Sequence, residues 1–282
     1  MIEVGDYTIW PLNDGYLDID QREVFVKEDP AALRQQLTGT KCVGDLIVRM
    51  QVHGYLVDTG EDLILIDTGS GDCGGATVGF LVDKLHSTGH DPSQVSLVLL
   101  THLHWDHIGG LLAADGTPAF PNATICVPAI GAAYWRDPAQ EALATDIIRP
   151  YFAIARKMLA PYESKGKLRL IQPGEIIVPG VTAIDASGHS PDHTAFLFTS
   201  DHKQVLFWGD IVHTAGIQFA KPEWFFAPDM DIQEAIMRKK SFFAKAADEF
   251  ILIGGAHLPL SGLGYVSRTG DAFAWEPLDD EK

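Results

Sequence analysis

The stretch His102-Leu103-His104-Trp105-Asp106-His107 directly follows the apolar run 95–101 and gathers three imidazoles and a carboxylate within six residues. Side chains two positions apart at a strand end share a face, so His102 and His104 can point to one place. Asp106 and His107 lie beyond the strand end and can turn toward a second place. Imidazole and carboxylate groups are suitable ligands for zinc and similar divalent metals. The sequence therefore predicts that this one loop supplies most of the ligands for two adjacent metal ions.

Three further ligand-type side chains follow later strand-like runs. His189 comes after the run 181–186, Asp210 after 205–208, and His257 after 250–253, and each is preceded by a glycine or an alanine. Functional side chains concentrate on loops held by a rigid framework. One histidine in such a place is more often structural than a ligand. The repeated setting nevertheless predicts a composite site assembled from several strand ends.

Composition restricts the class of protein. The 282 residues carry a formal net charge of −17, and so acidic a surface repels nucleic acid and anionic membranes. The basic cluster 238–240 is interpreted as the solvated face of a helix. No apolar run approaches the roughly 20 residues that cross a bilayer. The N-terminus lacks the features of a signal peptide, which predicts a cytoplasmic location.

The chain has three cysteines, which are widely spaced and form no CxxC motif. This arrangement argues against a disulfide framework and against a thiolate metal site. We therefore expect reduced and mostly buried thiols. The residues concerned are Cys42, Cys73 and Cys126.

Strand-like and helix-like patterns alternate along the chain and predict one domain, 1–282, of sheets sandwiched by helices. An N-terminal extension of about 1–45, a flap or dimer arm, contains a strand at 7–10, a turn at 13–15 and a helix near 30–37. An aromatic-rich helical insertion spans about 129–165. The other expected strands are 46–57, 63–66, 95–101, 124–127, 168–171, 176–178, 181–186, 195–199, 205–208 and 251–253, and the other expected helices are 77–88 and 231–247.

The chain resembles the metallo-β-lactamase-fold hydrolases in these residues. The resemblance rests on the motif His-x-His-x-Asp-His at 102–107 and extends from Asp67 to His257. Within that superfamily the chain is most similar to methyl parathion hydrolase and its relatives, next to the N-acyl homoserine lactonases. The additional cues are the segments 208–210, 218–219, 238–240 and 256–258. The resemblance implies an αββα sandwich, in which two mixed β-sheets are flanked by helices.

The resemblance also implies a ligand set. The first metal is expected at His102, His104 and His189, the second at Asp106, His107 and His257, and Asp210 is expected to bridge them together with a water or hydroxide. Zinc is the default, although manganese, iron or cobalt also suit such sites. Asp67 is either a residue that orients a ligand histidine or a strand-end turn residue. His193 is expected to support the ligands or the fold rather than to bind metal.

One position departs from the lactonase pattern. A tyrosine commonly follows the bridging aspartate by three residues in those enzymes, whereas this chain has His213. His213 either donates a proton or hydrogen bond during the reaction or forms part of the pocket wall. Asp106 is the other catalytic candidate, because it could steer the nucleophile or accept its proton. The expected reaction is hydrolysis of a carbonyl or phosphoryl ester.

Aromatic residues suggest the substrate pocket. Tyr134, Trp135, Tyr151 and Phe152 in the insertion, and Phe219 in the run 219–226, are the candidates. Aromatic walls suit a neutral hydrophobic ester or lactone. The alternative is that these rings pack in the core or in the interface of a homodimer.

The sequence is compatible with several functions. The first is a lactonase or esterase with promiscuous organophosphate triesterase activity. A β-lactamase is disfavoured by the bridging carboxylate at 210, and a nuclease or phosphodiesterase by the acidic charge. A non-enzymatic binding protein or a redox protein with a flavin partner is disfavoured by the complete ligand set.

Overall fold

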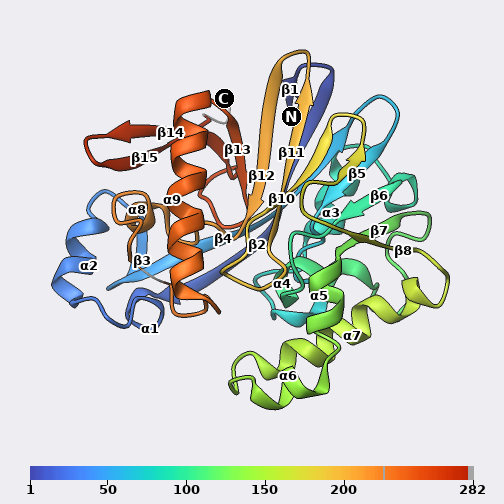
Figure 1. Cartoon of the computed structure of the whole chain (residues 1–282), viewed down its shortest axis with the longest axis horizontal. Coiled ribbons are helices and arrows are strands. Elements are labelled where there is room, and N and C mark those ends of the chain that lie inside the picture. The colour runs from blue at the N-terminus through green and yellow to red at the C-terminus, as the bar shows by residue number, and fades with distance from the viewer. Residues whose placement is uncertain (225, 279–282) are drawn as a thin grey trace.

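The strands of the computed structural model, which describes residues 1–224 and 226–278, form an eight-stranded and a seven-stranded sheet (Figure 1). Both sheets mix parallel and antiparallel pairs, so the expected sandwich of two mixed sheets is confirmed. The first sheet contains β1 (Ile2–Val4), β2 (Tyr7–Asp20), β3 (Cys42–Gly44), β4 (Ile47–Asp58), β5 (Leu63–Ile66), β6 (Leu97–Leu99), β7 (Thr124–Pro128) and β8 (Leu168–Ile171). The second contains β9 (Ile176–Val178), β10 (Val181–Asp185), β11 (Thr194–Ser200), β12 (Lys203–Gly209), β13 (Leu252–Gly255), β14 (Leu263–Thr269) and β15 (Ala272–Pro277).

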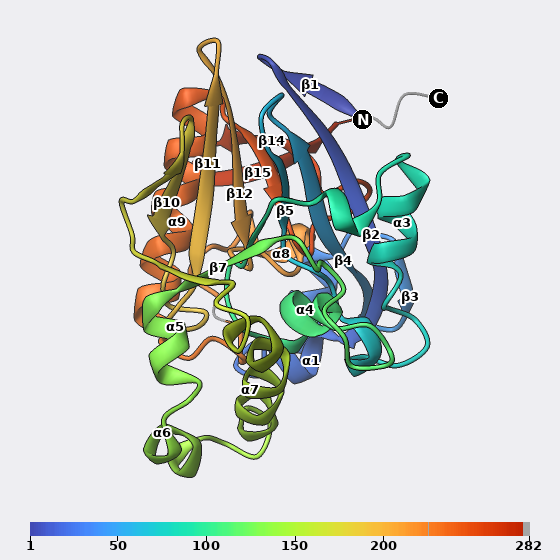
Figure 2. The ribbon, with the colours of Figure 1, turned by 90° about the vertical axis from the view of Figure 1, so that its right-hand side faces the viewer.

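Helices cover the outer faces of both sheets (Figure 2). The α-helices are α1 (Gln21–Val24), α2 (Pro30–Gln36), α3 (Leu81–Ser87), α4 (Trp105–Ile108), α5 (Ala129–Tyr134), α6 (Pro138–Leu143), α7 (Arg149–Glu163), α8 (Ala215–Gln218) and α9 (Ile232–Glu249). Three short 3₁₀ turns, η1 (Gly71–Cys73), η2 (Pro92–Gln94) and η3 (Gly109–Leu111), complete the described part. Within it, none of the helices has the length and apolar character that crossing a membrane requires.

The layers follow from the alternation of side chains along each strand. In β12, Phe207 joins the apolar cluster between the two sheets, whereas Leu206 and Trp208 join the cluster beneath α9. A third cluster fills the space between the first sheet and the helices α3 and α7. Strands such as β5, β6 and β7 are therefore covered on both faces, which explains why their sequences are continuously apolar.

The long helix α9 is defined by local signals at both of its ends. Asp231 caps the helix, because its carboxylate accepts a hydrogen bond of 3.0 Å from the Glu234 backbone N–H. The helix ends where Phe250 adopts a left-handed conformation with φ of +52°. This confirms the helix expected at 231–247, and α5 to α7 likewise confirm helices in the segment 129–165.

Several expectations were wrong in detail. The turn expected at 13–15 is a bulge inside β2, whose pairing with β4 shifts between Asn13 and Gly15. The extra residue, Asp14, is buried and accepts backbone hydrogen bonds from Ser70, Gly79 and Leu81. Most of the first twenty residues of the supposed extension are thus strands of the first sheet.

Three other features differ from expectation. Cys42 and Cys73 are exposed rather than buried, and all three thiols are free. The hairpin of β14 and β15 was not anticipated, and the helix expected at 77–88 begins only at Leu81.

Candidate metal centre

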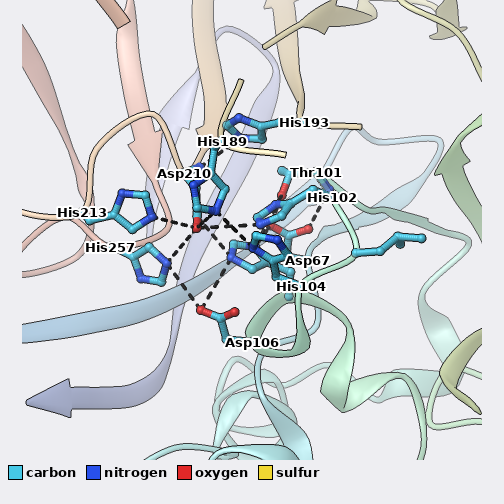
Figure 3. Close-up of polar contacts among 12 residues, drawn as sticks. Asp67, Thr101, His102, His104, Asp106, His189, His193, Asp210, His213 and His257 are labelled. Carbon is cyan, nitrogen blue, oxygen red and sulfur yellow. Dashed lines mark hydrogen bonds and ion pairs between the residues drawn. The ribbon is translucent and has the colours of Figure 1, made fainter. Parts of the chain in front are cut away.

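The candidate ligands lie at one edge of the sandwich, where strands of both sheets end. β5 pairs in parallel with β6 in the first sheet, and β12 pairs in parallel with β13 in the second. Parallel neighbours end on the same side, so the residues after β6, β12 and β13 meet. The loop after β10 adds His189 to this meeting point (Figure 3).

The loop 102–107 is fixed by close backbone packing. The Thr68 N–H and hydroxyl both donate to the His107 carbonyl, at 2.7 and 2.9 Å. A Cβ on Gly109 would lie 2.0 Å from the Ser70 carbonyl oxygen, and one on Gly110 would lie 2.0 Å from that of Thr68. The two glycines therefore allow the start of η3 to press against the segment after β5.

The Asp210 carboxylate is the centre of the cluster (Figure 3). Its oxygens lie 3.1 Å from His107 Nε2, 3.2 Å from His257 Nε2 and 3.3 Å from His189 Nε2. Around it, two ligand-type groups fit a metal ion each, with all ligand atoms of a group within 4.8 Å of one another. One group is His102, His104, His189 and Asp210, and the other is Asp106, His107 and His257.

Several buried polar atoms of this cluster lack ordinary hydrogen-bond partners. Nε2 of His102 and Nε2 of His107 make no hydrogen bond within the described residues, and neither does Oδ1 of Asp210. Burial of unpaired polar atoms is costly. A cation held between these atoms would remove that cost, so the donor set fits a metal ion. The set lacks thiolates, which agrees with zinc or a similar borderline ion.

The electrostatics of the group that contains His102, His104 and Asp210 favour the same interpretation. Burial, followed by the neighbouring imidazoles, holds the pKa values of His102 and His104 well below the ordinary value, which keeps both rings neutral. Burial opposes ionisation of Asp210, yet the surrounding histidines outweigh it and hold the pKa of this carboxyl well below its usual range. Neutral imidazole and ionised carboxylate are the forms that bind metal.

Three of the candidate ligand rings are held from behind by a second partner. His107 Nδ1 donates to Asp67 at 2.7 Å, and His257 Nδ1 donates to the Gln51 carbonyl at 2.8 Å. His189 Nδ1 donates to Asp229 at 2.9 Å. His193 is not among the residues facing the centre, since its Nε2 accepts the Asp210 backbone N–H at 3.0 Å. Such contacts fix the ring orientation and the tautomer of a ligand histidine.

Sequence reasoning did not identify two of these supports. Asp229 lies just before α9, which is capped by Asp231, and nothing in its local sequence links it to His189. The Gln51 contact is made by a backbone carbonyl, so no side-chain pattern could have indicated it.

His213 lies beside the proposed ligands. Its Nε2 is 3.1 Å from Asp210 Oδ2, its ring stacks on Phe226 at 3.9 Å, and its Nδ1 has no hydrogen-bond partner within the described residues. Gln218 holds the loop by accepting the backbone N–H groups of His213 and Thr214. His213 thus completes a third possible ligand group with Asp210 and His257.

The aromatic candidates divide into two sets. The rings of Tyr151 and Trp135 lie 5.1 and 5.6 Å from that of His104, although Trp135 is fully buried. Phe152 is a buried core residue of α7, and Phe219 packs against Trp208, Phe243 and Trp275 beneath α9. For Phe152 and Phe219 the structure therefore favours core packing over the expected pocket wall.

Two cavities adjoin the cluster. One of about 470 Å³ is lined by His213 and His257 together with the apolar side chains of Val43, Met50 and Leu260. The other, of about 600 Å³, lies between α1, the inserted helices and the segment 227–230. Tyr134, Leu143, Ile148 and Met230 are among its lining residues, and its charged lining groups within the described residues are Glu23 and Asp229.

Comparison with known proteins agrees with this architecture. The model of the Metallo-beta-lactamase superfamily matches residues 47–255. The crystal structure of hydrolase AbOPH in the beta lactamase superfamily has a TM-score of 0.93 and 30% identity, covering 100% of this chain and 97% of that one. AidC, a dizinc quorum-quenching lactonase, has a TM-score of 0.91 and 26% identity with the same coverage.

Curated relatives are more distant. An atrochrysone carboxyl ACP thioesterase of Aspergillus terreus is 27% identical over 205 residues, which are 71% of this chain and 51% of the relative. The N-acyl homoserine lactonase AiiA of Bacillus thuringiensis subsp. kurstaki is 24% identical over 188 residues, 60% of this chain and 66% of the relative. The chain thus spans between half and two thirds of the length of these relatives.

Proposed function

The chain belongs to the metallo-β-lactamase superfamily, and we propose that it is a dinuclear metal-dependent hydrolase that opens lactones or cleaves esters of neutral, apolar acids. The observation that carries the proposal is the position of Asp210 between two separate groups of ligand-type side chains. A single structural metal would need only one of those groups.

In this proposal His102, His104 and His189 hold one ion, Asp106, His107 and His257 hold the other, and Asp210 contacts both. Zinc is the proposed metal. When bound, two such ions would supply a hydroxide nucleophile at neutral pH and would polarise the substrate carbonyl. The likeness to AidC, a dizinc lactonase, supports both the number of ions and the choice of metal.

The protein supplies orientation and proton transfer. Asp106 lies at the start of α4, where its Oδ2 is 3.4 Å from His257 Nε2 and 3.7 Å from His107 Nε2. At that position its carboxylate orients the attacking water and accepts its proton. His213 Nε2 lies 3.1 Å from Asp210 Oδ2 and its side chain lines the cavity beside His257, and we assign to it a hydrogen bond or a proton for the leaving alcohol.

The cavity beside His213 and His257 is the proposed place of the scissile ester, because it reaches the ligand cluster directly. Two cationic side chains, Lys41 and Arg49, line this cavity, and the Arg49 guanidinium is already paired with Asp18 at 2.9 Å. The net charge of −17 disfavours anionic diesters and nucleic acid as substrates. A neutral phosphotriester satisfies the same requirements, so organophosphate hydrolysis is proposed as a side activity.

The test is elemental analysis of the purified protein combined with a substrate panel. The panel contains an acyl homoserine lactone, a γ-lactone, a neutral phosphotriester, a chromogenic cephalosporin and a phosphate diester, each assayed before and after chelation. We expect two metal ions per chain and chelator-sensitive hydrolysis of the lactones. Turnover of the diester or the cephalosporin alone would replace this proposal with a phosphodiesterase or a β-lactamase. Light scattering of the same sample tests the expected homodimer.

A further inference from the structure

The loop that carries His189 also contains Asp192, a buried acidic residue outside the groups of candidate metal ligands. Asp192 is 1% exposed, and each of its carboxylate oxygens accepts a hydrogen bond from another segment of the chain. Its Oδ2 accepts the Leu103 backbone N–H at 3.0 Å, and its Oδ1 accepts the Trp135 indole N–H at 3.1 Å. Burying a carboxylate is costly unless it is hydrogen-bonded, so these two bonds help to hold Asp192 in the interior.

The first bond joins the two loops that supply the first proposed ion. Leu103 lies between His102 and His104, so fixing its N–H fixes the backbone between these two ligands. The loop after β6 belongs to the first sheet and the loop after β10 to the second. The Thr194 N–H donates to the Thr101 carbonyl at 2.8 Å and joins the same two segments a second time. The buried carboxylate and this backbone pair therefore set how the ligands from the two sheets face each other.

The second bond extends the contact to the helical insertion. Trp135 is fully buried at the end of α5, and the centre of its ring lies 4.9 Å from that of Phe152 and 5.6 Å from that of His104. A Cβ on Gly131 would lie 2.4 Å from Asp192 Oδ2, so α5 passes directly against the carboxylate. Asp192 thus contacts the inserted helices where they approach the ligand cluster.

We propose that Asp192 is a positioning residue that couples the metal centre to the aromatic wall beside it. Its Oδ2 acts through the Leu103 N–H and keeps the two flanking imidazoles directed at the first ion. Its Oδ1 acts through the Trp135 indole and keeps the end of α5 beside that ion. Asp192 itself contacts neither metal nor substrate in this role. The inference rests on the proposed function, because the first ion and the substrate pocket are both part of that proposal.

The experiment compares Asp192→Ala and Asp192→Asn, each alone and combined with Trp135→Phe. The metal-free proteins are titrated with Co²⁺, whose visible spectrum reports the ligand geometry, and Zn²⁺ affinities are measured by competition with a chromogenic chelator. KM and kcat for a γ-lactone are measured on the fully metal-loaded proteins. Asp201→Asn removes an equal charge from the exposed turn between β11 and β12. It is the matched control and should behave as the wild type does.

Alanine at position 192 removes both hydrogen bonds. We expect Asp192→Ala to weaken one of the two bound ions by about tenfold and to change the Co²⁺ spectrum. KM should rise several-fold while kcat changes little. An asparagine amide has one carbonyl oxygen, and its other end is a donor, so it can serve only one of the two N–H groups. Asp192→Asn should therefore keep either the metal affinity or the KM of the wild type, but not both.

Trp135→Phe separates the two routes. Phenylalanine has no N–H, so the amide of Asp192→Asn can then direct its carbonyl to Leu103. The double variant with asparagine should bind metal as tightly as Trp135→Phe alone, whereas Asp192→Ala should still weaken binding about tenfold in the same background. The asparagine variants decide the question even if Asp192→Ala does not fold.

Wild-type metal affinity together with wild-type KM, in either Asp192→Ala or Asp192→Asn, would overturn the inference. A lower melting temperature with both properties unchanged would do the same, because it would assign Asp192 to the stability of the fold alone. In these cases a wild-type protein that binds two ions leaves the proposed function in place. A wild-type protein that binds no metal would overturn the proposed function and, with it, this inference.

Discussion

Replacement of Asp67 by asparagine isolates the effect of one proton on the metal centre. Asp67 has φ of +56°, a conformation that asparagine adopts readily, so the backbone should tolerate the change. Its Oδ1 accepts the Thr101 N–H at 2.8 Å, and its Oδ2 accepts the Thr101 hydroxyl and the His107 Nδ1 proton, each at 2.7 Å. An amide can preserve the first of these bonds but not both of the others.

The amide nitrogen is a donor, so its placement against His107 requires Nδ1 to become an acceptor. The proton then moves to Nε2, the atom that lies 3.1 Å from Asp210 and that we assign to a metal ion. We expect the affinity for one of the two ions to fall about 10- to 100-fold. That loss corresponds to about 1.4 to 2.8 kcal/mol of binding free energy.

Competition with a chromogenic chelator measures the two affinities, and denaturant unfolding of the metal-free protein measures stability. Asp83→Asn, on the exposed face of α3, removes the same charge and serves as control. The two interpretations of Asp67 then give different results. If Asp67 is only a turn residue, the substitution changes the stability of the metal-free protein and leaves the metal affinity intact. Two ions bound to Asp67→Asn with wild-type affinity would therefore refute the tautomer argument.

Three further predictions use other parts of the structure. Burial lowers the pKa of His53 to about 4, so between pH 6.5 and 4 only the unfolded state binds this proton. His53 alone should account for about 3 kcal/mol of the stability that the metal-free protein loses as pH falls through this window, and His53→Gln should reduce the loss by that amount whereas the exposed His86→Gln should not. Gly110→Ala should destabilise the fold by about 1–3 kcal/mol in thermal unfolding, because its Cβ would meet the Thr68 carbonyl in a packed loop; an unchanged melting temperature would contradict this. Tyr151→Phe should raise KM several-fold with normal metal content, because the hydroxyl accepts the Trp105 indole N–H beside His104, and an unchanged KM would place Tyr151 outside the substrate pocket.

The sequence predicted the parts of the structure that depend on local patterns. Strands such as β8 and β9 match the expected ranges because short apolar runs between turn residues define them. The ligand-type residues were found because each follows a strand end. The hairpin of β14 and β15 was not predicted, because most of its residues are half-exposed or exposed and its sequence lacks a clear alternation of apolar and polar residues.

Contacts between distant residues were much harder to anticipate. Phe219 and Phe226 lie in one aromatic run, yet Phe219 packs beneath α9 while Phe226 stacks on His213. Nothing in the local pattern distinguishes the two, since the choice depends on which element each faces after folding. The same holds for Asp229, whose neighbour His189 is 40 residues away.

The composite centre spans the interface between the two sheets. The loop after β6 carries His102 to His107 from the first sheet, whereas His189, Asp210 and His257 come from the second. Protein contacts already cross the same boundary, since the Tyr55 hydroxyl donates to the Gly255 carbonyl and the Thr194 N–H donates to the Thr101 carbonyl. Ions shared by both sets of ligands would add a link between the sheets. Metal binding and the packing of the sandwich should therefore be thermodynamically coupled, so that the melting temperature rises with free metal concentration.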